Sequence, residues 1–153
     1  MTHVLTVTPN SPTGAEHTIT IEVHPSREAM LEYLDAQFPE DGWRTPNEAG
    51  TLPAGGFRNT GGYEHNHAPV DLGTIYLCED WLDVNTIAHE ATHAAMHVYA
   101  CDVLGIYSRA MRHIGGFNED IAYLVGDLVG DVMTELYDLG LYAEQETKVD
   151  PVP

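Results

Sequence analysis

The chain has 153 residues, enough for one domain with a hydrophobic core and too few for two ordinary domains. It carries 24 acidic residues against 6 Lys and Arg, a formal net charge of -18 at pH 7. Such a surface repels phosphate groups and anionic lipid headgroups, so neither nucleic acid nor a membrane is expected as a direct partner. The charge alone does not distinguish a well-solvated surface from adaptation to salt or mimicry of a nucleic-acid duplex.

The cysteines bear on the compartment. Cys78 and Cys101 are too few for the disulfide framework of a small secreted domain, and neither belongs to a Cys-x-x-Cys pair. Both are expected to be reduced thiols. The sequence does not begin with a basic leader and an apolar stretch, and it contains no apolar run of membrane-spanning length. These features predict a cytoplasmic protein.

Two strands and a helix are predicted at the start of the chain. Residues 3–8 are rich in β-branched side chains, and residues 18–23 alternate apolar with polar side chains. Turn-forming residues at positions 9–14 join them, which predicts a hairpin with a long loop. Ser26 is a typical N-cap, and a helix is expected from there to about Phe38. Its apolar side should carry Met30, Leu31, Leu34 and Phe38.

A stretch rich in Gly, Pro and Asn follows at residues 39–73 and predicts either an irregular loop or a second hairpin. His65 and His67 within it alternate as two residues on one strand face do, but in such a sequence an ordinary loop is favoured over a second metal site. Residues 74–79 then predict a short strand directly before the next helix.

Two longer helices are predicted in the second half of the chain. The first runs from about Leu82 to Leu104, and the second from about Asn118 to Leu139, with Gly140 as its C-cap. Expected core residues are Ile87, Ala91, Ala94, Val98 and Cys101 in the first helix, and Ile121, Leu124, Val125, Leu128, Val132 and Leu136 in the second. Together the elements predict one α+β domain over residues 1–140, a small mixed or antiparallel sheet packed on about three helices, with a flexible tail at 141–153.

The first of these helices contains the segment His89-Glu90-Ala91-Thr92-His93. Two histidines four residues apart project from one helix face about one turn apart, so both imidazoles can bind a single metal ion. Glu90 lies about 100° around the helix from His89, where it can contact a water on that metal without binding the metal itself. The histidines lie away from the apolar stripe, which favours a metal site over a pair of ordinary surface histidines.

A catalytic zinc has three protein ligands and one open position, so a third ligand must come from elsewhere. Glu119 is the expected ligand, because the 26 residues after His93 leave room for the chain to reverse. Ala122, Gly126 and Gly130 form a stripe of small residues on the last helix, which predicts a close approach of the two helices. The alternative is that Glu119 is only a favourable acidic residue in a first helical turn.

The segment His89 to His93 and the later segment Asn118 to Tyr123 resemble the paired signatures of the gluzincin class of zinc metallopeptidases, over roughly residues 74–127. The resemblance implies a zincin-like fold and a Zn2+ ion bound by His89, His93 and Glu119. It also implies that Glu90 is the general base.

The second signature departs from that of thermolysin-like members, which reads Asn-Glu-x-x-Ser-Asp. This chain has Ala122 and Tyr123 at the last two positions. The aspartate that orients a zinc-binding histidine is therefore missing, and Asp120 or Asp127 would have to replace it.

The resemblance also implies how a substrate is held. In gluzincin-like domains an edge strand before the active-site helix binds an extended peptide, and residues 74–79 are placed to do so; the alternative is a central strand that buries Ile75 and Leu77. A developing oxyanion needs a donor, for which Tyr123 is preferred to His113. His97 lies about 12 Å along the helix axis from His89, too far to share its ion, and is expected to contact the metal-binding side chains or to face a partner.

The sequence thus predicts a zinc-dependent metallopeptidase that hydrolyses an amide bond in a peptide or protein. Two alternatives stay open. One is a zincin-fold module that binds a partner without catalysis. The other is an acidic duplex mimic, which would leave the arrangement of His89 and His93 unexplained.

Overall fold

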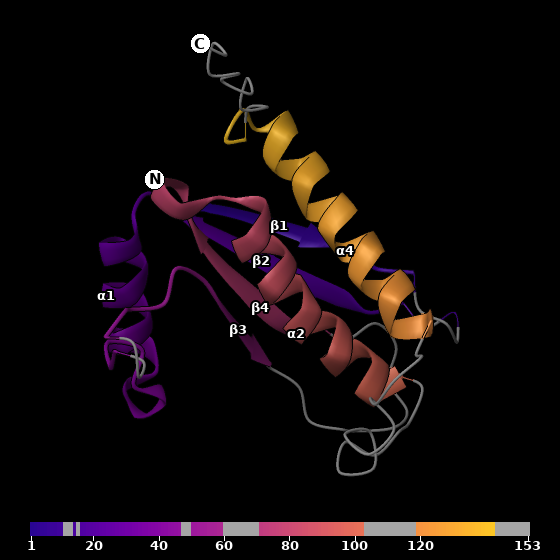
Figure 1. Ribbon diagram of the computed structural model, residues 1–153, viewed down its shortest axis with the longest axis horizontal. Helices are drawn as coiled ribbons and strands as arrows, with labels where there is room; N and C mark the ends of the chain where they lie inside the picture. Colours follow the sequence, from indigo (N-terminus) through magenta and orange to yellow (C-terminus); the bar gives the residue numbers. More distant parts are fainter. Residues whose placement is uncertain (11–13, 15, 47–49, 60–70, 103–118, 143–153) are drawn as a thin grey trace, which may run out of the picture.

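The computed structural model describes residues 1–10, 14, 16–46, 50–59, 71–102 and 119–142, with the backbone alone at 102 and 119–123. Figure 1 shows the arrangement of its elements. In chain order they are β1 (His3–Val7), β2 (Thr18–His24), α1 (Arg27–Gln37), the short 3-10 helix η1 (Pro39–Asp41), β3 (Gly56–Asn59), β4 (Asp71–Cys78), the 3-10 helix η2 (Glu79–Trp81), α2 (Val84–Asp102) and α4 (Glu119–Asp138).

The four strands form one mixed sheet in the order β1-β2-β4-β3. β1 and β2 are the predicted antiparallel hairpin, β2 and β4 are parallel, and β3 runs antiparallel to β4. The α+β class with a small mixed sheet is therefore confirmed. In the Gly- and Pro-rich stretch, residues 56–59 form a strand as in the second-hairpin interpretation, while 60–70, with His65 and His67, lie outside the described residues.

The strand predicted at residues 74–79 is central in the sheet, so the central-strand alternative is confirmed and the edge-strand alternative is wrong. β4 is buried from Leu72 to Cys78, which requires cover on both faces and a neighbour on each side. Ile75 and Leu77 are indeed buried. β3, which pairs with β4, is the edge strand on that side of the sheet.

The two faces of the sheet are covered by different helices. Ile19, Ile21 and Val23 alternate along β2 and are fully buried in the cluster formed with α2 and α4, which lie over that face (Figure 1). On the other face, α1 packs its buried apolar side chains against Tyr76 and Cys78 of β4. Those side chains are Met30, Leu31 and Leu34, as predicted, with Phe38 partly buried beside them.

The helix ends follow the local sequence. The Ser26 hydroxyl accepts a hydrogen bond from the N–H of Ala29 at 3.2 Å, which caps α1. Gly140 adopts a φ of 69°, and the N–H of Leu141 donates to the carbonyl of Leu136 at 3.0 Å. This is the left-handed C-cap predicted for α4.

The stripe of small residues on α4 does not face α2, which corrects the expectation of a close approach there. Gly126 and Gly130 are exposed, and apart from the adjacent backbone of α4 itself no described atom lies within 4 Å of a Cβ built on either. α4 packs through leucine and valine, because larger apolar side chains lose more exposed surface on burial. The buried residues are Leu124, Leu128, Val132 and Leu136; Val125 is half-buried, and the side chains of Ile121 and Ala122 lie outside the described part.

In α2 the predicted apolar stripe is buried at Ile87, Ala91, Ala94 and Val98, and Cys101 is half-buried. Neither cysteine is in a disulfide. Within the described ranges, no helix combines the length and apolar character needed to cross a membrane.

Candidate metal centre

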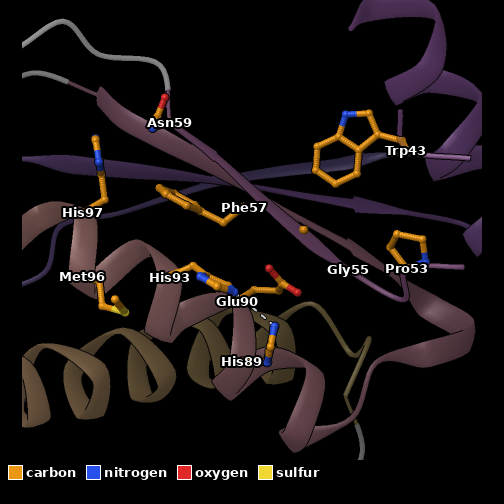
Figure 2. Close-up of a pocket in the computed structure, with 11 residues that line it drawn as sticks. Trp43, Pro53, Gly55, Phe57, Asn59, His89, Glu90, His93, Met96 and His97 are labelled. Atoms are coloured by element: carbon orange, nitrogen blue, oxygen red, sulfur yellow. Dashed lines mark hydrogen bonds between the residues drawn. The ribbon is translucent and has the colours of Figure 1, made fainter. Parts of the chain in front are cut away.

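A cavity of about 480 Å³ lies between α2 on one side and Trp43, Pro53 and residues 55–59 on the other (Figure 2). Its size is in the range usual for ligand sites. Its lining residues are Trp43, Pro53, Gly55, Gly56, Phe57, Asn59, His89, Glu90, His93, Met96 and His97.

His89 and His93 lie side by side at this cavity, as their spacing on α2 predicts. Their Nε2 atoms are 3.2 Å apart, and their ring planes meet at 77° (Figure 2). Two nitrogens that each bind a tetrahedral zinc at about 2.0–2.1 Å lie roughly 3.3 Å from each other, so the observed separation fits two ligands of one ion. Both side chains are exposed, so an ion can reach them from solvent.

Glu90 differs from its histidine neighbours because it is only 7% exposed. Its burial raises the pKa of the carboxyl to about 7, which places it where a proton is gained or lost near neutral pH. Because residue 55 is a glycine, the backbone that faces α2 can come close to the Glu90 side chain. A Cβ on Gly55 would lie 3.1 Å from the Cγ of Glu90 and 3.1 Å from the carbonyl oxygen of Tyr76.

The wall opposite α2 is apolar and includes side chains that the sequence analysis did not assign to the site. Phe57 projects from β3 across the cavity from His93 and Met96 (Figure 2). Trp43 lies against Gly56, where a Cβ would come within 2.4 Å of the indole Cζ3. The only sequence signal for this wall is the pair Gly55-Gly56 beside an aromatic residue.

Arg58 fixes this wall to the preceding segment. Its Nε donates to Asp41 Oδ2 at 2.9 Å, and its guanidinium lies 3.8 Å from the ring centroid of Phe38. This charge-assisted hydrogen bond and this cation–π contact hold β3 against residues 38–41, which precede Trp43 in the chain. The cavity therefore has a defined shape on the β3 side.

His97 is 4% exposed, so the alternative that it faces a partner is wrong. It lines the same cavity as the paired histidines, with its ring centroid 5.9 Å from that of Phe57. Its Nε2 lies 3.5 Å from the Sγ of Cys101. Burial lowers the pKa of His97, which favours the neutral imidazole. β3 covers this turn of α2. The helical spacing of residues in α2 could not predict this, because the covering strand is far away in the sequence.

Several predicted site residues are not placed by the structure. His113 lies outside the described residues, as do the side chains of Glu119, Asp120 and Tyr123, although Glu119 is the first residue of α4. Asp127 is half-buried on α4. The pKa of Asp131 is raised, first by its own burial and then by the negative charge of Asp127. Among the described residues, no three His, Cys, Asp or Glu side chains are grouped to hold a metal ion. The third ligand thus stays a prediction.

No family model matches the chain, and searches of curated proteins and of solved structures likewise find no match. Two imidazole nitrogens at co-ligand separation and a buried carboxyl on the next residue can hold a cation and transfer a proton beside it. The apolar wall can bind an uncharged part of a ligand.

Proposed function

We propose that this chain is a zinc-dependent metallopeptidase of zincin-like fold that hydrolyses an amide bond in a peptide or protein. The observation that carries the proposal is the 3.2 Å separation of the Nε2 atoms of His89 and His93 beside the buried Glu90, on one wall of a cavity. Glu119 is proposed as the third ligand, from its sequence position alone.

Each residue then has a chemical role. A zinc ion held by His89, His93 and Glu119 would polarise the scissile carbonyl and acidify a water. Glu90 would take the proton of that water as the water oxygen attacks the carbonyl carbon, and would pass it to the amine nitrogen as the C–N bond breaks, a task for which a buried carboxyl is suited. Tyr123, or failing it His113, is proposed to donate a hydrogen bond to the oxyanion.

The substrate is proposed to bind along β3 rather than along the strand that the sequence suggested. β3 is an edge strand that pairs with β4 on one side and with no described strand on the other. An extended peptide can add to such an edge through main-chain hydrogen bonds. Phe57 and the glycines of this segment line the cavity, so a peptide on this edge would pass the histidine pair.

A cytoplasmic location is part of the proposal. Cys78 and Cys101 are free, which suits a reducing compartment.

The experiment measures zinc content and peptide cleavage in matched variants. The wild type should hold about one zinc ion per chain, and His93→Ala should lose it while His3→Ala, which removes a histidine on β1, retains it. Glu119→Gln should lose zinc, with Glu135→Gln on α4 as its control.

Glu90→Gln separates binding from catalysis. It should keep its zinc and lose cleavage by about 10²–10⁴-fold, since the proton acceptor is gone. Cleavage at the wild-type rate in Glu90→Gln would refute the mechanism. Zinc in the wild type with no cleavage of a peptide library would favour the non-catalytic binding module instead.

A further inference from the structure

A second cavity, of about 420 Å³, lies on the opposite face of the sheet from the paired histidines. Its lining residues come from the start of the chain and β1, from the end of β2 and from α1. Figure 1 shows these elements. Val4, Pro25 and Ala29 contribute apolar surface to it, and Glu22, His24 and Tyr33 contribute functional groups. None of these groups belongs to the proposed metal centre.

His24 is the buried polar side chain of this cavity. It is 3% exposed, and its Nε2 makes no hydrogen bond within the described part of the chain. Glu22 Oε2 lies 3.5 Å from this nitrogen, beyond the distance of a good hydrogen bond. On the other side of the ring, Nδ1 lies 3.5 Å from the hydroxyl of Thr2. A buried imidazole nitrogen without a partner costs free energy that a bound donor would recover.

The strand period places the two groups together. Glu22 and His24 are two residues apart on β2, so both point away from the core face that holds Ile21 and Val23. Burial raises the pKa of Glu22 and lowers that of His24, so both groups have lost hydration. A ligand that donates hydrogen bonds to both would restore what water no longer supplies.

The surroundings favour a positively charged donor. Tyr33 lies with its ring centroid 5.0 Å from that of His24, which supplies an aromatic face at the cavity. No Lys or Arg is among the described residues that line it. Met1 also lines it and carries the α-ammonium, but this residue is 89% exposed to solvent, and the chain as a whole has a net charge of -18. An anion would meet the Glu22 carboxylate and a repulsive field, whereas a cation is attracted by both.

We propose that this cavity binds a primary ammonium group on an apolar stem, carried by a free alkylamine or by a lysine side chain of a peptide. The ammonium donates to Glu22 Oε2 and His24 Nε2, and the stem packs against Val4, Pro25 and Ala29. A bare metal ion would use the two ligand atoms but leave the apolar volume unfilled, so an organic cation fits the cavity better.

The test follows the imidazole nitrogen signals of His24 by NMR while n-butylammonium is added to the full chain. A saturable shift at His24 is expected, with no shift from n-butanol, which has the same stem without the charge. Glu22→Gln keeps the size of the side chain and should weaken binding by about tenfold or more, since a hydrogen bond to a charged group is lost. Glu32→Gln removes an exposed charge from α1 and should bind as the wild type does.

Further arms identify the occupant. A lysine-containing peptide that binds more tightly than n-butylammonium, and loses binding when norleucine replaces the lysine, identifies a protein side chain; equal or weaker binding identifies a free amine. If Glu22→Gln does not fold, Tyr33→Leu should weaken binding by about two- to fivefold through the lost aromatic face. No saturable shift at His24, an equal response to n-butanol, or a response to Zn2+ alone would overturn the proposal.

Discussion

Gly73→Ala and Gly130→Ala make the same chemical change and are expected to alter stability in opposite directions. A Cβ on Gly73 would lie 2.6 Å from two ring atoms of Phe57 and 2.7 Å from the backbone carbonyl oxygen of Arg58. The ring can rotate, but the carbonyl belongs to the paired strand β3 and cannot move without opening the sheet. Such overpacking costs about 1–3 kcal/mol, which lowers Tm by roughly 3–10 °C in a domain of this size.

Gly130 is in the interior of α4 and exposed, and apart from the adjacent backbone of α4 itself a Cβ there meets no described atom within 4 Å. Alanine should raise the free energy of unfolding by about 0.5–1 kcal/mol, because glycine loses more backbone entropy in a helix. Urea and thermal unfolding followed by circular dichroism measure both changes. A Gly73→Ala variant as stable as the wild type would refute the packing described at β3 and β4, and a Gly130→Ala variant that lowers Tm would refute the open space described at α4.

Three further predictions concern the core, alkaline pH and a helix cap. Leu128→Ala should lower the free energy of unfolding by about 2–5 kcal/mol because the side chain is fully buried, whereas Tyr137→Ala, 63% exposed, should change it by less than about 0.5 kcal/mol in the same urea titration. Burial raises the pKa of Cys78 from 9.0 to about 12, so its contribution to stability is complete below pH 9 and is lost as pH rises toward 12. Cys78→Ala should therefore flatten the dependence of stability on pH in that window, and an unchanged slope would contradict the burial of the thiol. Ser26→Ala should cost about 1 kcal/mol through the lost cap of α1, and an unaltered urea midpoint would show that the cap contributes little.

The elements that were predicted well depend on neighbours in the sequence. The β1–β2 hairpin, the cap at Ser26 and the C-cap at Gly140 each involve residues that are close along the chain or a strand period that any sheet imposes. The separation of His89 and His93 is local in the same way, because four residues along a helix place two side chains together wherever that helix packs.

The points that the sequence left open or predicted wrongly share a different cause. The order of strands puts β4 in the centre and β3 at the edge, and no local pattern contains that order. Gly126 is exposed and His97 is buried because of which element packs on each helix face. Both depend on contacts between residues far apart in the sequence.

By itself, the sequence determined that one helix presents His89, Glu90 and His93 together, and that the chain is an acidic α+β domain, since helical spacing and composition are properties of the chain alone. Tertiary structure decided what faces them. The approach of Gly55 to Glu90 and the wall at Phe57 exist because β3 pairs with β4 beside α2. A cavity is the space left between elements, so its shape and the burial that raises the pKa of Glu90 arise only when distant segments pack.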